Sequence, residues 1–216
     1  MVLGLNERLK TAGYAVVENL LREEHLSEVS HVTEQLIRRW QANEFNSEDF
    51  RTYKLSEAPM PILYRIHNLE KKHHCIEQLV KSRPLMDTVQ GLMGTEAVPT
   101  AFALIIKMPY YGGKVPYHRD PVAVPHGTIY NFSVFLDDSG PENGCFEAVP
   151  GSHLLLGETE MFDERPEGAV FVSARRGDVL VHDVRVIHGS EFSRSERLRR
   201  SICVEFQPAY MLGRSG

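Results

Sequence analysis

Cysteine is scarce in this sequence, which has only Cys75, Cys145 and Cys203 among its 216 residues. Three cysteines at wide spacings fit neither a disulfide framework, which needs an even number, nor the close pairs of a zinc knuckle. We therefore expect three reduced thiols that are buried for structural reasons.

Long apolar runs are absent as well. Nowhere do roughly eighteen apolar residues follow one another, and the N-terminal stretch MVLGLNERLK has no apolar run after a basic start. Because a membrane-spanning helix and a secretory signal both need such runs, the sequence predicts neither. We expect a cytoplasmic protein without a membrane partner.

The sequence also lacks an excess of positive charge. Its 24 Lys and Arg residues stand against 29 Asp and Glu residues, which gives a formal net charge of −5. Neutralising a phosphate backbone requires a basic face, so this balance argues against a nucleic-acid-binding protein. The short basic clusters at Arg38–Arg39 and Arg197–Arg200 are typical of solvated surface.

The chain does contain enough apolar sequence for a sizeable core. Hydrophobic residues make up 42% of it and charged residues 25%, and its length predicts a single domain over residues 1–216. Residues 1–95 are predicted to be mainly helical support, and residues 96–208 are predicted to form the core of the fold.

One N-terminal segment, residues 21–45, has a clear helical period. Acidic residues come early in it and basic residues late, as the helix dipole prefers. Residues 13–21 predict a strand before this helix, and residues 68–82 and 85–94 predict two further helices. The apolar positions that recur at three- and four-residue steps are Leu26, Val29, Val32, Leu36 and Trp40.

From Val98 onward, short runs rich in Val, Ile, Phe and Tyr alternate with Gly, Pro, Asp and Asn, which predicts strands and turns. No helix of useful length lies between the runs, so we expect antiparallel rather than parallel sheet. The expected fold class is mainly β with α, namely a double-stranded β-helix (a cupin-like jelly roll) with N-terminal helices packed on one sheet. The predicted strands are residues 101–110, 127–138, 145–150, 177–190 and 199–208.

A possible metal site begins at His118-Arg119-Asp120. If this His-x-Asp sits at a strand end, the two-residue period places the imidazole and the carboxylate on one face. The stretch VRVIHGSEF offers His188 as a third ligand at the end of an alternating strand. Two imidazoles and one carboxylate suit ferrous iron with three open positions, and they also serve catalytic zinc.

Four blocks occur together in the order HRD (118–120), ENGCFEAVPGSH (142–153), RRGDVLVHD (175–183) and HGSEFSRSERLRRS (188–201). In this order and spacing the chain resembles the phytanoyl-CoA dioxygenase family of iron- and 2-oxoglutarate-dependent oxygenases. The resemblance implies that His118, Asp120 and His188 hold Fe(II) as the catalytic ligand set. It also implies 2-oxoglutarate and O2 as co-substrates.

A co-substrate with two carboxylates needs a fixed cation at its far end, and a guanidinium supplies a planar bidentate contact. Arg199, eleven positions after His188, is the predicted residue. Strand alternation then turns Arg200 away from the site, and Arg197 is expected to face solvent. The resemblance adds further co-substrate contacts at Lys107, Tyr117, Ser133 and Ser190. An outward lysine on an edge strand remains the alternative for Lys107.

For other polar residues, a structural role is the alternative to binding a metal or a substrate. The histidines expected to be structural rather than ligands are His73, His74, His126, His153 and His182. Residues near the expected mouth of the site could bind an anionic small molecule or could simply be surface. These substrate candidates are Arg65, Arg119, Asn131 and Arg185.

The resemblance implies an enzyme that oxidises a C–H bond of a small-molecule metabolite or natural-product intermediate, with release of succinate and CO2. A carboxylate at Asp120 favours hydroxylation over halogenation, while desaturation, epoxidation and ring formation use the same ligands. Two alternatives from other classes are a zinc-dependent hydrolase on the same triad and a non-catalytic jelly-roll binding protein. The sequence predicts no oligomeric state.

Overall fold

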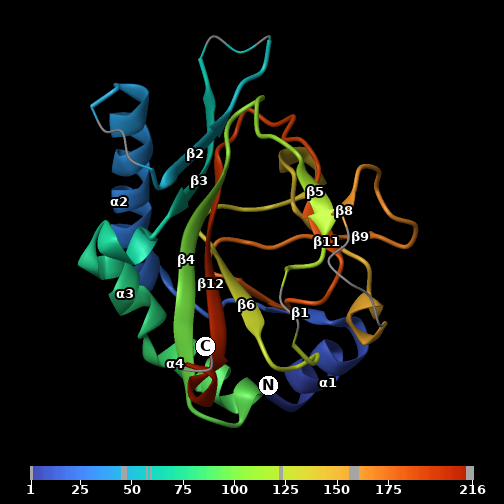
Figure 1. Cartoon of the computed structure of the whole chain (residues 1–216). Helices are drawn as coiled ribbons and strands as arrows, with labels where there is room; N and C mark the ends of the chain where they lie inside the picture. Colours follow the sequence, from blue (N-terminus) through green and yellow to red (C-terminus); the bar gives the residue numbers. More distant parts are fainter. Residues whose placement is uncertain are drawn as a thin grey trace.

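The structure is a computed structural model that describes residues 2–44, 48–56, 58, 60–121, 124–155 and 161–212. Two antiparallel sheets face each other, and helices lie on the outer side of the larger sheet (Figure 1). This arrangement confirms the predicted fold class, a jelly-roll core with N-terminal helices packed on one sheet.

The larger sheet has seven strands in the spatial order β1-β10-β6-β12-β4-β3-β2, and the smaller has five in the order β8-β5-β11-β7-β9. The strands of the larger sheet are β1 (Tyr14–Val17), β2 (Phe50–Tyr53), β3 (Ile62–His67), β4 (Ala97–Lys107), β6 (Tyr130–Phe135), β10 (Val179–Asp183) and β12 (Arg199–Pro208). Those of the smaller sheet are β5 (Val115–His118), β7 (Phe146–Ala148), β8 (Met161–Phe162), β9 (Val170–Val172) and β11 (His188–Ser190).

Four α-helices occur in the described part of the chain, together with short 3₁₀ turns. Helices α2, α3 and α4 lie on one side of β4, β6 and β12, whereas β5 and β11 lie on the other side (Figure 1). The helices are α1 (Val2–Ala12), α2 (Glu23–Gln41), α3 (His74–Val80) and α4 (Arg83–Met93). The 3₁₀ turns are η1 (Leu69–Lys71), η2 (Pro141–Asn143), η3 (Ser152–Leu154) and η4 (Ala209–Met211). None of these described helices combines the length and apolar character that crossing a membrane would require.

Each central strand of the larger sheet has one apolar face and one face that lines a cavity. In β12, Ile202, Val204 and Phe206 are buried in the main hydrophobic cluster. The alternate residues Ser201 and Cys203 line the cavity between the sheets. Since successive side chains of a strand point to opposite faces, one sheet both carries the core and forms a wall of the site.

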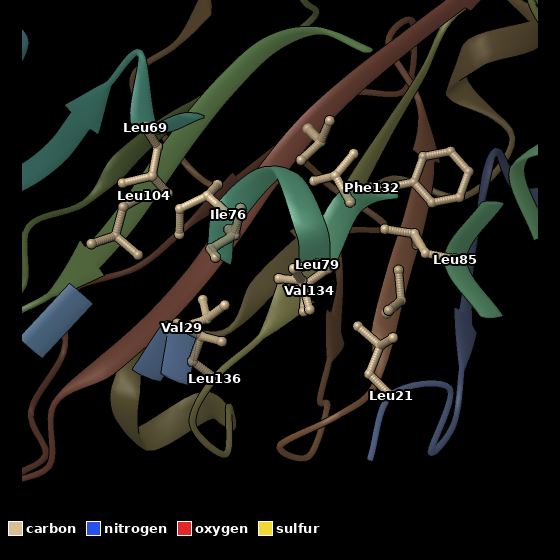
Figure 2. Packing of buried hydrophobic residues seen from close by; sticks show 14 of the residues in the cluster. Leu21, Val29, Leu69, Ile76, Leu79, Leu85, Leu104, Phe132, Val134 and Leu136 are labelled. Carbon is tan, nitrogen blue, oxygen red and sulfur yellow. The ribbon is translucent and has the colours of Figure 1, made fainter. Parts of the chain in front are cut away.

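The apolar face of the larger sheet is covered by the helices. Figure 2 shows Leu104 of β4 and Val134 of β6 among Ile76 and Leu79 of α3, with Val29 of α2 nearby. Ile76, Leu104 and Val134 have no exposed surface. Burying each such side chain stabilises the fold by about 2 kcal/mol, so this contact holds the sheet in place.

Helix α2 is the most accurately predicted helix. It spans Glu23–Gln41 within the predicted range 21–45, with acidic residues in the first turn and basic residues in the last. The positions predicted for its inner face are buried or pack partly buried against the core: Leu26, Val29, Val32, Leu36 and Trp40.

The sequence pattern does not predict α1, β2 or β3 within residues 1–95. Strands β2 and β3 extend the larger sheet next to β4. A register shift between Arg51 and Thr52 interrupts their pairing. A bulge of this kind breaks the two-residue alternation, so the pattern of apolar residues is hard to recognise.

The predicted strand 177–190 is in fact two strands that belong to different sheets. The side chain of Asp183 accepts a hydrogen bond from the Arg185 backbone N–H (2.9 Å), and the Asp183 carbonyl accepts one from Val186 (3.0 Å). This Asx turn ends β10, and β11 then begins in the smaller sheet. The apolar alternation continues through the turn, which is why the sequence reads as one strand.

Arg200 points away from the cavity, as alternation predicts, and joins β12 to α2. Its guanidinium makes two hydrogen bonds of 2.9 Å to the carboxylate of Asp137. It also donates to the Ser30 carbonyl (2.9 Å) and to the Thr33 hydroxyl (3.2 Å). A buried guanidinium with all these partners fixes the helix to the sheet, while Arg197 is exposed as expected.

We predict that Asp137→Ala destabilises the protein by about 3 kcal/mol, because it leaves the Arg200 guanidinium buried without its carboxylate. Urea unfolding followed by circular dichroism measures this change. Arg200→Met should be less harmful, since it removes the charge together with its need for a partner. Arg197→Gln is the control and should change stability by less than about 0.5 kcal/mol. Equal effects of Asp137→Ala and the control would contradict the proposed role of the pair.

Candidate metal centre and its cavity

A cavity of about 630 Å³ lies between the two sheets. Its walls come from the inward face of the larger sheet and from β5 and β11 of the smaller one. All of the residues that the sequence predicts as metal ligands line it, as does Arg199. The volume is in the range of cavities that hold small organic ligands.

The three predicted metal ligands come together at one end of the smaller sheet. His118 ends β5 and His188 begins β11, and the two residues are direct partners in the antiparallel register. Their ring centroids are 4.4 Å apart, and His118 Nε2 lies 3.5 Å from Asp120 Oδ1. One potential ligand atom from each of the three residues lies within 4.8 Å of the others, so the group could hold one metal ion.

Backbone carbonyls fix the orientation of both imidazoles. His118 Nδ1 lies 2.8 Å from the Pro116 carbonyl, and His188 Nδ1 lies 3.0 Å from the Val186 carbonyl. Because a carbonyl can only accept, each Nδ1 carries the proton and donates it. The Nε2 lone pairs are then free to bind a metal, which is the usual second contact of a metal-ligating histidine.

Asn131 holds the second oxygen of Asp120. Its Nδ2 donates a hydrogen bond of 2.8 Å to Asp120 Oδ2, on the opposite side of the carboxylate from the imidazole. Burial opposes ionisation of Asp120, but the neighbouring imidazoles of His118, His188 and His182 outweigh it and lower the pKa. The carboxylate is therefore ionised and has one oxygen left for a metal. Asn131, predicted as a substrate residue, also contacts a predicted metal ligand.

The segment between β10 and β11 supports the centre with three consecutive carbonyls. The Val184 carbonyl accepts from the backbone N–H of Asp120 (3.1 Å), and the Arg185 carbonyl accepts from the Arg119 guanidinium (2.7 Å). The Val186 carbonyl accepts from His188 (3.0 Å). One short segment thus fixes both halves of the candidate site.

At another part of the cavity, two buried cations face each other across neighbouring strands. Arg199 on β12 and Lys107 on β4 are direct partners in the register and are 4% and 1% exposed. Burial lowers the pKa of Arg199 to about 10. Burial, and then the nearby Arg199, lower the pKa of Lys107 to about 7. Because β4 is an internal strand and Lys107 lines the cavity, the alternative of an outward edge lysine is wrong.

These two cations have no carboxylate partner. Lys107 Nζ donates only to the backbone carbonyls of Gly113 and Glu191. The Arg199 Nε is buried without an acceptor, and no described residue forms a hydrogen bond or ion pair with this guanidinium. An unpaired buried charge is unfavourable, so its position in a cavity wall fits an anionic ligand.

The other predicted co-substrate contacts divide into two groups. Ser133 and Ser190 line the same cavity as Arg199. Tyr117 does not: it is fully buried beside Ala169 and Ile187 in a separate apolar cluster. Neighbouring residues of a strand face opposite ways, so a β5 that turns His118 inward must turn Tyr117 outward.

The predicted substrate residues also divide. Arg65 and Asn131 line the cavity, whereas Arg119 and Arg185 are not among its lining residues. Arg119 is 5% exposed and donates to the carbonyls of Ser152 (2.8 Å) and Arg185 (2.7 Å). Arg185 donates to the Leu155 carbonyl (3.2 Å). Both guanidiniums are therefore engaged by the protein itself.

The cavity residues that are missing from the sequence-based site include His182, Phe146 and Cys203. His182, expected to be structural, lies with its ring centroid 4.6 Å from that of His188. The Phe146 ring stacks on His188 at a 17° angle between the planes. Cys203 is a free thiol, as predicted, but it lines the cavity. Alternation along β10 could have identified His182. Asp183 next to it faces away from the cavity, where its carboxylate accepts a hydrogen bond from the Gly127 backbone N–H, so His182 faces the cavity.

A second group of potential ligand atoms lies between α2 and α3, where Glu28, His73 and Cys75 come within 4.8 Å of one another. In this group His73 Nδ1 accepts a hydrogen bond from the Cys75 backbone N–H (3.3 Å) at the start of α3. That bond gives His73 a capping role. The prediction that this stretch is structural is compatible with the geometry.

The chain is similar to known proteins over most of its length. The sequence profile described as "Phytanoyl-CoA dioxygenase (PhyH)" matches residues 9–201. A probable alpha-ketoglutarate-dependent hypophosphite dioxygenase from Stutzerimonas stutzeri is 24% identical over 216 residues, covering 91% of this chain and 75% of the relative.

Two solved structures resemble the fold. AviO1 from Streptomyces viridochromogenes Tue57 has a TM-score of 0.86 and 36% identity, covering 97% of this chain and 96% of the other. The alpha ketoglutarate dependent epimerase SnoN from nogalamycin biosynthesis has a TM-score of 0.74 and 21% identity, covering 96% and 83%. At this low identity, the second likeness supports the fold alone.

We predict that Asn131→Ala weakens metal binding about tenfold, because contacts behind metal ligands typically contribute this much. Titration of the apoprotein with Mn(II) in the absence of 2-oxoglutarate measures the affinity. Ser133→Ala is the matched control, since Ser133 lies on the same strand and face but makes no hydrogen bond to His118, Asp120 or His188. Unchanged Mn(II) affinity in Asn131→Ala would show that the Asp120 contact is dispensable.

The low pKa of Lys107 leads us to predict a specific pH dependence of the protein's stability. This pKa is about 7 in the folded protein against an ordinary value of 10.5. Between these values the unfolded chain binds a proton that the folded protein does not. The free energy of unfolding therefore rises with increasing pH, by up to about 1.4 kcal/mol per pH unit from this group. In Lys107→Met this rise disappears. Urea unfolding of both proteins at several pH values from 7 to 10 measures the difference. If the free energy of unfolding changed with pH equally in the wild type and in Lys107→Met, the prediction would be wrong.

Proposed function

The chain belongs to the phytanoyl-CoA dioxygenase family, and on this basis we propose that it hydroxylates a C–H bond of a small molecule. Its cofactors are Fe(II), 2-oxoglutarate and O2. In the proposed reaction the substrate, 2-oxoglutarate and O2 give the hydroxylated product, succinate and CO2. The observation that carries the proposal is a buried, unpaired guanidinium at Arg199 in the same cavity as a His/Asp/His triad.

The residues present fit an iron ion. His118 and His188 would bind it through Nε2 and Asp120 through Oδ1, because their other polar atoms already have partners. Two imidazoles and a carboxylate leave three positions open, as non-haem iron oxygenases require. Bound iron, together with 2-oxoglutarate and O2, supplies the oxidising chemistry, and the protein binds, orients and excludes water.

The cation pair fits the far carboxylate of 2-oxoglutarate. Arg199 can donate two parallel hydrogen bonds to it, and Lys107, when protonated, adds a second positive charge from the neighbouring strand. We propose that the hydroxyls of Ser133 and Ser190, which line the same cavity, add polar contacts. Tyr117 has no part in this proposal, because its side chain lies on the other face of β5.

Apolar side chains form much of the wall around this polar site. Phe135 and Leu180 of the larger sheet and Phe146 of the smaller sheet line the cavity. Such walls keep the dielectric low, which strengthens the contact between Arg199 and a carboxylate. They also limit the access of water to the centre.

The metal ligands do not decide the type of oxidation. SnoN is an epimerase and SnoK, from the same biosynthesis, is a carbocyclase, and both are alpha ketoglutarate dependent. The hypophosphite and 2-aminoethylphosphonate dioxygenases act on small phosphorus-containing molecules. We propose hydroxylation of a small, negatively charged molecule because the triad keeps its carboxylate and the cavity wall carries unpaired cations.

The two alternatives explain fewer observations. A zinc-dependent hydrolase could use the same triad but would leave Arg199 and Lys107 buried without a function. A non-catalytic binding protein would not need two imidazoles with their Nε2 atoms free and directed at one carboxylate. We propose further that residues 1–216 act as one catalytic domain, in which residues 1–95 support the larger sheet.

We predict that Arg199→Gln weakens 2-oxoglutarate binding about tenfold to a hundredfold, since a hydrogen bond to a charged group contributes about 1.5–3 kcal/mol. Anaerobic titration with Fe(II) present, followed by the weak visible charge-transfer band of the chelate, measures the affinity. Arg197→Gln, a nearby exposed arginine, is the control and should bind like the wild type. No band in the wild type, or equal affinity in Arg199→Gln, would refute the proposed function.

A further inference from the structure

The cavity has room for more than the co-substrate. Beyond the part next to Arg199 and Lys107, it extends along β2 and β3, where Tyr53, Arg65 and His67 line it. A volume of about 630 Å³ is in the range for drug-sized ligands, so a five-carbon dicarboxylate leaves space on this side.

The arginines that are not exposed fall into two groups. Four of them use their guanidinium groups to bond to carboxylates, hydroxyls or carbonyls of the protein: Arg119, Arg176, Arg185 and Arg200. In the described part of the chain, Arg65 and Arg199 form no such bond, and the Nε of each is buried without an acceptor. Both of these line the cavity.

Arg65 also lies among other positive groups. It pairs directly with Arg51 of β2 in the register, and His67 follows two positions later on the same face of β3. Burial, and then the charges of Arg65 and Arg51, lower the pKa of His67. The nearby carboxylate of Asp49 is already engaged by Asn68 (2.6 Å) and by a lysine.

The remaining carboxylates that face this region are also occupied. Glu205 Oε1 accepts a hydrogen bond from the Thr100 hydroxyl (2.7 Å). Asp120 is held by Asn131 and lies beside His118. Arg65 is close enough to Cys203 for its charge to oppose the burial that raises the pKa of that thiol to about 11. Arg65 therefore lies in the cavity wall near Cys203, and no carboxylate in the described part of the chain bonds to its guanidinium.

Arg65 and Arg199 lie in different parts of the cavity wall. Arg65 pairs with Ile105 of β4, which pairs with Ser201 of β12, whereas Arg199 pairs with Lys107. With neighbouring strands about 4.8 Å apart and residues about 3.4 Å apart along a strand, their Cα atoms are separated by roughly 12 Å. Two separate anionic groups can be bound at the same time.

We propose that Arg65 forms a second anion site, which binds a carboxylate or phosphoryl oxyanion of the substrate while Arg199 holds 2-oxoglutarate. This inference rests on the proposed function and names the substrate class, a small molecule with an oxyanion group. The guanidinium offers a planar pair of donors to such a group. A neutral analogue leaves the charge unpaired, so the site selects against it.

The test uses the holoprotein with Mn(II) and saturating 2-oxoglutarate, so that the site at Arg199 is filled. Calorimetric titrations with acetate, inorganic phosphate and acetamide then probe the remaining cavity. We expect acetate or phosphate to bind at one site, and the tighter of the two identifies the oxyanion. Acetamide, which has nearly the shape of acetate without its charge, should not bind.

In Arg65→Gln we expect the affinity for the bound anion to fall about tenfold or more. The anion affinity of Arg65→Lys should lie between those of the wild type and Arg65→Gln, because lysine keeps the charge and loses the planar pair of donors. The control Arg197→Gln should bind like the wild type. A lack of anion binding by the wild type, or equal affinity in Arg65→Gln, would overturn the inference.

Thermal unfolding separates a binding role from a structural one. In buffer without these anions, Arg65→Gln should be at least as stable as the wild type, because the guanidinium has no partner to lose. Adding the bound anion should raise the melting temperature of the wild type and not that of the variant. A lower melting temperature of Arg65→Gln without anions would indicate a structural role and contradict the proposal.

The 2-oxoglutarate affinity of Arg65→Gln distinguishes this inference from the proposed function. If the visible band and its titration are unchanged, the co-substrate site is intact and the anion titrations test Arg65 alone. If Arg65→Gln weakens 2-oxoglutarate instead of acetate or phosphate, Arg65 contacts the co-substrate and the second anion site is refuted. The proposed function fails if the wild type itself shows no band, or if Arg199→Gln binds 2-oxoglutarate as tightly as the wild type.

Discussion

The alternation of side chains along the strands of the larger sheet is the constraint on which the rest of the structure depends. Arg199 and Arg200 are neighbours on β12, yet one faces the cavity and the other bonds to Asp137 and α2. The same alternation places apolar residues against the helices and polar residues around the candidate metal centre. A single sheet therefore connects the stability of the core to the geometry of the site.

Much of this arrangement could be predicted from the sequence. The His-x-Asp spacing and the distant His188 identify the triad, and alternation correctly separates Arg199 from Arg200. The same rule turns Tyr117 away from the cavity, because its neighbour His118 faces inward. Residue spacing decides the side of a strand, so it overrides the expectation taken from the family resemblance.

Other features could not be predicted because they depend on contacts between distant segments. The Asx turn at Asp183 divides an apparently continuous strand between two sheets. Asn131 contacts Asp120 only because the fold brings β6 next to the candidate metal centre. Whether the guanidinium of an arginine has an acceptor depends on its neighbours in the fold, which is why Arg119 and Arg65 look alike in the sequence.

Three successive carbonyls, of Val184, Arg185 and Val186, hold Asp120, Arg119 and His188 in place. Because these bonds come from the main chain, the side chains of this segment can change without altering them. Among homologous proteins we therefore expect variable residue types but a constant number of residues here. Inserting or deleting one residue would move the two histidines relative to each other, a change that no side-chain replacement could correct.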